Sequence, residues 1–402
     1  MCMLPTDDGL TYAMGRPESL SVRPLLPFDG VARMFLAQLS ARMMADAATR
    51  TMPDVMSFAW WCRKANIERI AKTYDNAELR IGRGLAFHVT PTNVPVNFAF
   101  SWAFSLLAGN ANVVRLPNLD YPQIPFIVRH IAALMGEKAF AELRSMNAFV
   151  AYGHQEKITE AFSAIADARI VWGGDATIQA IRKSLLPPRG IDVCFSDRTS
   201  LCVLGAARIL ELEREALERL ASNFFNDAYI MDQNACSSPR LVVWLGKEME
   251  TEGAAERFWK AVGTLVGRRY ELSDVASVDK LIQACRDAIE LSCVTEMRRG
   301  DNRIYRLRLN ALTGETANRR CSSGYFYEYA TDQLDDVTAV VTSQVQTLTY
   351  FGVAREDIVL FVRQNRVRGI DRIVPVGEAM DIGLTWDGYD LIRTLSRICD
   401  VH

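Results

Sequence analysis

The sequence predicts an α/β fold in which a doubly wound parallel sheet is followed by a second α/β domain. Short apolar runs alternate with amphipathic stretches between residues 85 and 195, and the alternation then becomes less regular. Strands that are apolar along their whole length are typical of a parallel sheet covered on both faces. Because 402 residues exceed what one hydrophobic core usually supports, we expect domains at residues 1–200 and 201–375, with the segment from about residue 376 to 402 packing back on the first.

The elements of the first domain follow from the spacing of apolar residues. Two opening helices are predicted at 31–47 and 53–75, where apolar residues recur at helical spacing and Pro53 suits a first helical turn. Strands and helices then alternate: strands at 85–89, 112–116, 148–152, 169–172 and 191–195, and helices at 94–108, 124–135, 155–166 and 177–184. Sheets of this kind bind ligands at the carboxyl ends of their strands.

The second domain is predicted to mix strands and helices less regularly. It opens with a strand at 201–204 and a long helix at about 209–226. The remaining predicted elements are strands at 241–245, 303–308, 337–342, 347–351 and 358–362, and helices near 254–267 and 277–292.

Composition and charge favour small-molecule chemistry in the cytoplasm. A net charge of -2 with 49% hydrophobic residues gives no drive toward nucleic acid or an anionic membrane. The start of the chain lacks the features of a signal peptide, and no apolar run approaches the ~18 residues of a transmembrane span. The nine cysteines form no CxxC pair and the four histidines show no ligand spacing, so neither a disulfide framework nor a metal site is expected.

Cys236 is the candidate nucleophile. It lies in the run 232–239, Asp-Gln-Asn-Ala-Cys-Ser-Ser-Pro, on a predicted loop between a helix and a strand. The Gln, Asn and Ser residues around it could donate hydrogen bonds to a thiolate or an oxyanion. The alternative is a structural free cysteine, which is the more common role for any single cysteine.

Other candidate residues lie at the ends of predicted strands. Asn93, in the turn after the first strand of the sheet, could donate to an oxyanion or cap the next helix. Arg115 ends the next strand, where it could bind a cofactor ribose or phosphate or stand solvated. Gly173 and Gly174 could bring backbone N–H groups to a pyrophosphate or only permit a tight turn. His88 is predicted to be a hydrogen-bonded core residue, and no histidine offers an obvious base, so a Cys-His protease is poorly supported.

Four segments of the chain form a recognisable ordered set: Gly84–Pro95, Leu106–Leu116, the run around Cys236, and Gly369–Gly377 together with Trp386–Asp390. In this order they resemble the LuxC-type acyl-CoA reductases, a family within the aldehyde dehydrogenase superfamily. The match extends from about Arg80 to the end of the chain. The resemblance implies an aldehyde dehydrogenase-like fold with a cofactor domain and a catalytic cysteine domain.

The resemblance also implies the reaction and the roles of several residues. The family reduces long-chain acyl thioesters to aldehydes, so we expect an NADPH-dependent acyl-CoA reductase that forms an acyl-enzyme. Cys236 matches the family nucleophile and Asn93 the oxyanion-hole asparagine. The cofactor residues implied are Arg115, where the superfamily usually has a lysine, together with Thr90, Pro91, Gly173, Gly174 and Asp175. Asp175 places a negative charge where phosphate is expected, which does not suit that role.

One departure from the superfamily bears on the reaction. Hydrolytic aldehyde dehydrogenases carry a glutamate that activates water, and the counterpart here is 194–197, Cys-Phe-Ser-Asp, without it. Loss of this base suits a thioester that must survive until reduction, unless Asp197 is a displaced base. Two alternatives stay open: oxidation of an aldehyde to an acid or thioester, and a non-catalytic binding subunit of an acyl-transfer complex. The expected partners are acyl-CoA or an acyl-carrier thioester, an acyl-protein synthetase and further copies of the chain, with no nucleic acid.

Overall fold

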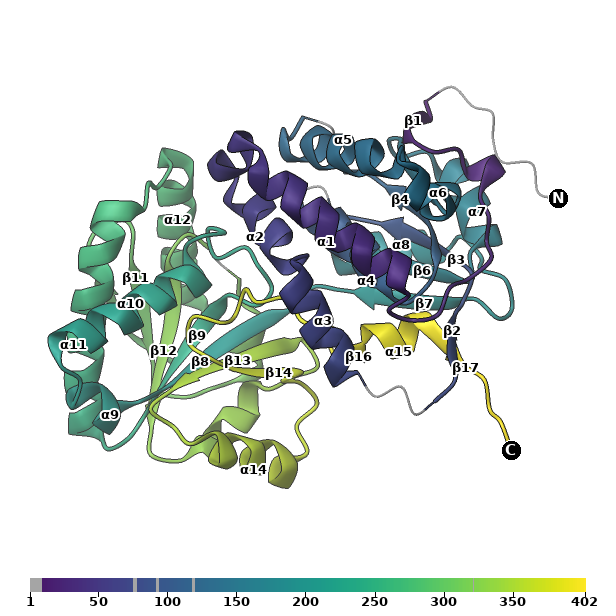
Figure 1. The fold of residues 1–402 in the computed structure, drawn as a ribbon. Coiled ribbons are helices and arrows are strands. Elements are labelled where there is room, and N and C mark those ends of the chain that lie inside the picture. Colours follow the sequence, from purple (N-terminus) through teal and green to yellow (C-terminus); the bar gives the residue numbers. More distant parts are fainter. Residues whose placement is uncertain (1–8, 75–77, 92–93, 118–119, 321) are drawn as a thin grey trace. The chain divides into compact units, whose positions relative to one another are not determined.

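The computed structural model describes residues 9–74, 78–91, 94–117, 120–320 and 322–402. The chain divides into two compact units, residues 1–196 with 389–402, and residues 197–388 (Figure 1). The boundaries lie at residues 196 and 389, against 200 and about 376 in the prediction. The roles predicted for the two units stay predictions.

The first unit is built on a six-stranded sheet in the order β1-β5-β4-β3-β6-β7. Its parallel strands are β3 (Leu85–Val89), β4 (Ala111–Arg115), β5 (Asn147–Ala151), β6 (Ala168–Trp172) and β7 (Ile191–Phe195). All five agree with the predicted strands to within one residue. β1 (Thr11–Met14) pairs antiparallel with β5 at the edge and was not predicted, because its four residues are too few to show a pattern.

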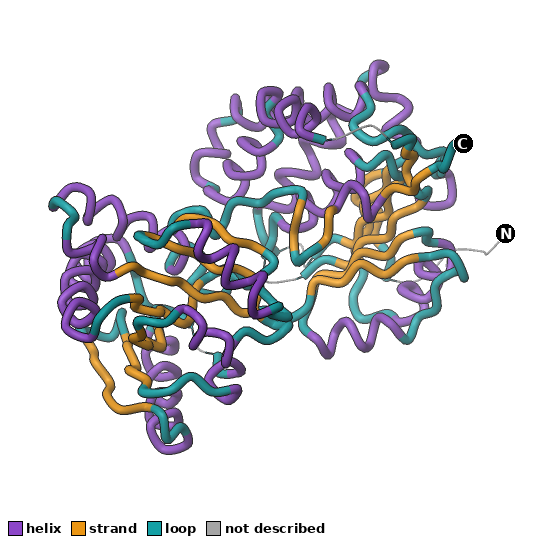
Figure 2. The backbone as a smooth tube through the Cα atoms, turned by 90° about the horizontal axis from the view of Figure 1, so that it is seen from below, coloured by secondary structure: helices purple, strands orange, loops and turns teal. Residues whose placement is uncertain are grey.

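Helices cover both faces of this sheet, as the prediction of a doubly wound sheet requires (Figure 2). One face packs against side chains of α7 and α8, including Phe162 and Ile178. On the other face, Trp102 of α4 packs edge-on against Phe149 and Phe35 of α1. The longer helices of this unit are α1 (Gly30–Ala45), α4 (Asn97–Leu107), α5 (Gln123–Met135), α7 (Glu156–Ile165) and α8 (Asp175–Arg182).

Two features of this unit differ from the prediction or extend it. The helix expected at 53–75 is two helices, α2 (Pro53–Trp61) and α3 (Lys64–Thr73), because Arg63 adopts a non-helical conformation at the start of α3. The C-terminal segment returns through α15 (Leu391–Leu395) and β17 (Ser396–Ile398), and β17 pairs antiparallel with β2 (Arg80–Gly82). The carbonyl of Leu395 also accepts a 2.9 Å hydrogen bond from the buried Asn110 side chain. The smaller α6 spans Ala141–Ser145.

The second unit contains a seven-stranded sheet in the order β10-β11-β12-β9-β8-β13-β14. All its strands are parallel except β10, which pairs antiparallel with β11 at the edge. The strands are β8 (Thr199–Gly205), β9 (Pro239–Leu245), β10 (Val294–Arg299), β11 (Tyr305–Leu309), β12 (Tyr325–Thr331), β13 (Val345–Phe351) and β14 (Arg372–Pro375). The helices are α9 (Ala206–Leu210), α10 (Arg214–Ala228), α11 (Glu248–Arg269), α12 (Asp274–Glu290), α13 (Gly314–Asn318), α14 (Arg355–Asn365) and the 3-10 helix η4 (Leu334–Val340).

Two strands predicted in the second unit are wrong. Residues 337–342 belong to η4 and the turn after it, where Val337 and Val340 are buried three residues apart. Residues 358–362 lie in α14, which buries Ile358 and Phe361 at the same spacing and has acidic residues in its first turn. Both segments are short apolar runs, for which periodicity cannot separate helix from strand. Among the described residues, no helix is both long and apolar enough to cross a membrane.

Candidate active site

Cys236 lies on the loop between α10 and β9, at the amino end of a strand inside the sheet, as predicted. The loop is held by buried side chains. Gln233 donates 2.9 Å hydrogen bonds to the carbonyls of Pro239 and Tyr325 and accepts from the Tyr325 N–H at 3.0 Å. Ser238 donates to the carbonyl of Asp227 at 2.7 Å. These side chains were expected to face the sulfur, but their hydrogen bonds hold the loop instead.

A different amide contacts the sulfur. The Nε2 atom of Gln346, a buried residue of β13, lies 3.3 Å from Cys236 Sγ and also donates to the Asp387 carboxylate. Since a carboxylate only accepts hydrogen bonds, Asp387 determines that the NH2 group of Gln346 faces the sulfur. The Gln346 carbonyl in turn accepts from the Thr347 hydroxyl at 3.3 Å. Cys236, a partly exposed residue, therefore has an oriented side-chain donor at its sulfur.

The charges around Cys236 set its protonation. Burial, and to a smaller extent the Asp387 carboxylate, raise the pKa of the Cys236 thiol to about 11. The Gln346 hydrogen bond and the Arg198 guanidinium lower this pKa, but by less. Arg198 forms an ion pair with Asp371 and donates to the Val345 carbonyl at 3.1 Å. Cys236 is consequently a thiol at neutral pH in this structure.

A loop after β14 forms one side of the site, and Asp227 of α10 holds it. The Asp227 carboxylate accepts from the N–H of Gly377 at 2.6 Å and of Ala379 at 3.0 Å. Burial raises the pKa of Asp227 to about 7. At Gly377, with φ at 105°, a Cβ atom would lie 2.8 Å from Asn223, so only glycine fits. The loop brings the Met380 sulfur to 3.6 Å from the hydroxyl of Ser237, next to the nucleophile.

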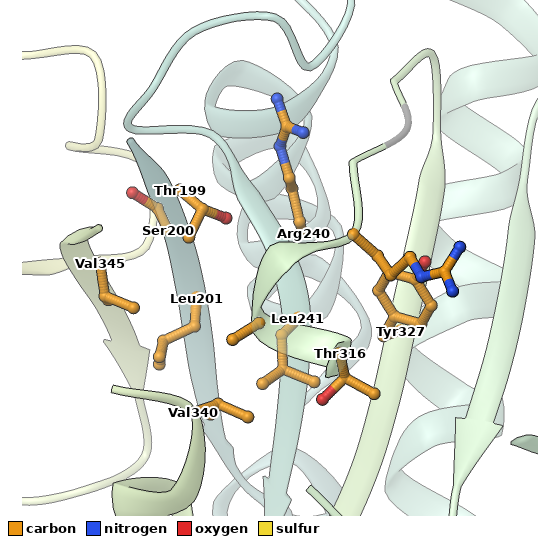
Figure 3. A pocket seen from close by; sticks show the side chains of 11 residues that line it. Thr199, Ser200, Leu201, Arg240, Leu241, Thr316, Tyr327, Val340 and Val345 are labelled. Atoms are coloured by element: carbon orange, nitrogen blue, oxygen red, sulfur yellow. The ribbon is translucent and has the colours of Figure 1, made fainter. Parts of the chain in front are cut away.

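A small cavity of about 30 Å³ adjoins the Cys236 loop (Figure 3). Ser200 connects the two, since it lines the cavity and donates a 2.7 Å hydrogen bond to the Cys236 carbonyl. Figure 3 shows apolar side chains pointing into the same space, while the Arg240 guanidinium extends away from them. The apolar residues lining it are Leu201, Leu241, Ala317, Val340 and Val345. A space of this volume holds about two water molecules or a short alkyl segment.

The first unit has a larger cavity, of about 740 Å³, at the carboxyl ends of β3, β4, β5 and β6. The structure brings five of the residues predicted to bind a cofactor together around it: Thr90, Pro91, Arg115, Gly173 and Gly174. Asp175, the first residue of α8, is not among the lining residues. Asn93 lies outside the described residues. The cavity has the size of a cofactor site and the position expected for one in a parallel sheet.

The guanidinium of Arg115 already has partners within the protein, which the sequence did not show. Its Nη2 donates to the Gly153 carbonyl at 2.8 Å and its Nε to the Tyr152 carbonyl at 3.3 Å. The guanidinium also lies 4.6 Å from the centre of the Tyr152 ring. These contacts hold the side chain at the cavity. Among the residues that the structure describes, none accepts a hydrogen bond from Nη1, whose N–H groups can donate to a ligand.

The remaining predicted residues have structural partners. His88 is buried, with 2.8 Å to Ser101 Oγ and 3.1 Å to Asn112 Oδ1, and burial lowers its pKa to about 4. It is thus a hydrogen-bonded core residue, as predicted. Asp197 forms an ion pair with Arg320 at 3.1 Å. Asp387 accepts a hydrogen bond from the same Gln346 amide that contacts Cys236. It lies in the Trp386–Asp390 segment, but the sequence alone predicted no role for it.

Solved structures of other proteins share this fold. Proline utilization A (PutA) from Bradyrhizobium japonicum superposes with a TM-score of 0.63 at 16% identity, covering 92% of this chain and 42% of that protein, so the chain spans less than half of it. Lactaldehyde dehydrogenase from Escherichia coli superposes with a TM-score of 0.63 at 11% identity, covering 93% of this chain and 86% of that one. No curated protein matches the sequence.

The family assignment comes from the sequence. The family described as acyl-CoA reductase (LuxC) matches residues 30–271, more than half of the chain. This range contains Cys236 and all the residues lining the larger cavity except Gly9 and Thr11. With an aldehyde dehydrogenase-like fold and this match, the chain belongs to the acyl-CoA reductase (LuxC) family.

Proposed function

We propose that the chain reduces an acyl thioester, such as a long-chain acyl-CoA, to the aldehyde with NADPH, through an acyl-enzyme on Cys236. The family assignment and the fold support an oxidoreductase acting on acyl or aldehyde groups. The observation that carries the proposal is the display of a partly exposed cysteine at the amino end of β9 with the Gln346 amide aimed at its sulfur.

Attack by Cys236 requires loss of its proton and a place for the new negative charge. The thiolate sulfur forms a bond to the thioester carbonyl carbon, the carbon-sulfur bond to the carrier breaks, and the carrier thiolate leaves and takes up a proton. Gln346 stabilises the thiolate through its N–H group. Asn93 remains the predicted donor to the oxyanion, a role typically worth about 3 kcal/mol of activation free energy.

The cavity of the first unit suits a nicotinamide dinucleotide. Its volume of about 740 Å³ lies within the range of small-molecule sites. Gly173 permits close approach, since a Cβ atom there would already be 3.2 Å from the Thr177 side chain. Gly174 is the N-cap of α8, so the first N–H groups of that helix are available to phosphate oxygens. When bound, the reduced nicotinamide supplies the hydride that converts the acyl group to the aldehyde.

The apolar cavity beside the Cys236 loop is suited to the acyl chain. Five of its eleven lining residues are aliphatic, and Ser200 connects it to the backbone of the nucleophile. A volume of about 30 Å³ takes only a short part of a chain. A long-chain substrate therefore requires the chain to extend beyond this cavity or the walls to move.

A second reaction is supported by Asp387. This carboxyl group shares the Gln346 amide with Cys236, and burial raises its pKa, as expected for a group that could accept a proton. It could activate water, which would suit oxidation of an aldehyde to an acid. Asp387 rather than Asp197 is then the candidate for the displaced base.

The test is a screen of NADPH oxidation over acyl-CoA chain lengths, with aldehyde identified by mass spectrometry. We expect consumption of NADPH, release of free CoA and formation of aldehyde in equal amounts. Aldehyde oxidation with NADP and water, without reduction of any acyl-CoA, would support the Asp387 reaction and refute the reductase. A screen in which no thioester or aldehyde turns over would support the binding-subunit alternative.

A further inference from the structure

Helix α12 (Figure 1) belongs to the second unit. It is packed with polar side chains inward. Its buried residues are Lys280, Ala284 and Asp287. Lys280 donates to the carbonyl of Ser323 at 2.6 Å. The Asp287 carboxylate accepts from the hydroxyls of Tyr325 and Tyr327 at 2.6 and 2.5 Å. Since amphipathic helices normally bury their apolar side, this arrangement leaves the apolar side of α12 without a covering layer in the single chain.

The outward side of α12 carries an apolar stripe. Val275, Val278, Ile282 and Ile289 have exposed fractions of 70, 55, 51 and 85%, and Cys285 is also exposed. We call these five residues the α12 stripe. Their spacing of three, four, three and four residues places them in one row along about 21 Å of helix. The same spacing defines the contact positions of a two-helix coiled coil.

The apolar surface also extends beyond the stripe. Leu281, on the same side of α12, is 43% exposed, and Met297 of β10 is 40% exposed. α12 packs next to β10, the edge strand of the sheet. Soluble monomers rarely expose apolar patches that run on over several adjoining side chains, and such patches commonly mark contact surfaces.

From the stripe and its flanking charges we infer that α12 pairs antiparallel with α12 of a second copy of the chain, around a two-fold axis. The pairing that brings the stripes together places Val278 of one copy opposite Ile289 of the other, and Ile282 opposite Cys285. An interface of this kind is self-complementary, as a two-fold dimer requires. The inference goes beyond the proposed function and does not depend on it.

The charges beside the stripe favour this pairing. In the antiparallel register, Asp279 of each copy comes to lie beside Arg286 of the other, so two ion pairs form by symmetry. Neither residue forms an ion pair within the part of the chain that the structure describes. A parallel pairing would instead bring Asp274 of one copy near Asp279 of the other, two like charges. A second copy in antiparallel orientation therefore matches four of the five stripe residues, all but Val275, and the charges beside them.

The first test measures mass in solution by light scattering and sedimentation over a range of protein concentrations. We expect the wild-type chain to associate, and Ile282→Glu to raise the dissociation constant by roughly thirtyfold or more. The control is Met249→Glu, which changes an apolar residue that is 90% exposed on α11 and should leave association unchanged. Because Ile282 is half exposed, its substitution should leave the melting temperature of the monomer nearly unchanged.

The second test exchanges the charges. Asp279→Arg alone and Arg286→Asp alone should each weaken association, and the double variant should restore it, because its ion pairs re-form with reversed sign. The double variant has the same net charge as the wild type, so it controls for overall repulsion. A wild-type chain that is monomeric at about 50 µM, an Ile282→Glu variant with unchanged mass, or a double variant no better than the single ones would overturn the inference.

Discussion

Replacing Gln346 by Leu removes an oriented side-chain donor to the Cys236 sulfur while keeping a side chain of similar volume. The Nε2 atom of Gln346 lies 3.3 Å from Sγ, and the residue is fully buried, so no water replaces it without rearrangement. A hydrogen bond to a charged acceptor contributes about 1.5 to 3 kcal/mol, and sulfur belongs at the lower end of that range. Since about 1.4 kcal/mol corresponds to one pKa unit, we expect the pKa of Cys236 to rise by about one unit.

This shift has two opposing effects on reactivity. At a pH below the pKa, the thiolate fraction falls about tenfold for a rise of one unit. Thiolate nucleophilicity rises with pKa, with a Brønsted coefficient of about 0.4 to 0.5, which returns about a factor of three. The Gln346→Leu variant should therefore react about three times more slowly with a disulfide reagent at pH 8.

Asp387→Asn changes the same thiol in the opposite direction. The Asp387 carboxylate raises the pKa of Cys236, so its neutralisation lowers that pKa and speeds the reaction at pH 8. Gln346→Leu also leaves the Asp387 carboxyl without its amide partner, which alters the charge beside the sulfur. The comparison of Gln346→Leu with and without Asp387→Asn isolates the hydrogen bond from this effect.

The assay follows reaction with dithiodipyridine between pH 7 and 10, with peptide mass spectrometry identifying each modified cysteine. The partly exposed Cys399, in the C-terminal segment of the first unit, serves as an internal control and should react equally in all variants. For the wild type, the rate at Cys236 should rise about tenfold per pH unit without levelling off near pH 8.5. A plateau near 8.5, equal rates in Gln346→Leu and wild type, or a slower Asp387→Asn variant would refute the reasoning.

Three further predictions concern cofactor choice and stability. Arg115→Ala should raise the Kd for NADPH about tenfold or more and that for NADH much less, measured by fluorescence titration; equal losses would show that Arg115 does not read the 2'-phosphate. Asp227→Ala leaves the Gly377 and Ala379 N–H groups without an acceptor and should lower the free energy of unfolding by about 3 kcal/mol in urea titrations, while a loss below about 0.5 kcal/mol would contradict this. Burial depresses the pKa of His88 from 6.5 to about 4 in the folded state. The free energy of unfolding should therefore be highest above pH 7 and fall by about 3 kcal/mol as the pH drops from 6.5 to 4. In His88→Gln this part of the pH dependence should be absent from urea titrations.

The five parallel strands of the first sheet could be predicted because they are short, apolar runs separated by amphipathic helices, a pattern that the local sequence displays. Strand β12 could not be predicted in this way, although it lies inside the second sheet. It carries the buried residue Glu328. The Glu328 carboxylate accepts hydrogen bonds from Trp244 at 2.9 Å and Trp259 at 2.6 Å and forms an ion pair with Arg306, which together compensate for its burial. These partners are distant in sequence. The charge of Glu328 therefore made the segment look polar in the sequence, although the fold places it in the core.

In the candidate site, too, some residues could be predicted from the sequence and others could not. Cys236 lies on a loop between a helix and a strand, and the residues around the larger cavity lie at the ends of strands, so position along the chain located them. Gln346 is 110 residues from Cys236 and its contact with the sulfur depends on the pairing of β13 with β8. The inverted faces of α12 were also hidden, because the periodicity of a helix shows that it has an apolar side but not which way that side points.

The central claim is that Cys236 carries the acyl group, and direct trapping tests it. The chain is incubated with radiolabelled acyl-CoA without NADPH, denatured, and analysed for hydroxylamine-labile label and for the modified peptide. We predict close to one label per chain on Cys236, its release as aldehyde when NADPH is added, and no label in Cys236→Ser, because a serine hydroxyl without a base is a poor nucleophile at neutral pH. Full labelling of the Cys236→Ser variant, or label on another cysteine, would contradict the account.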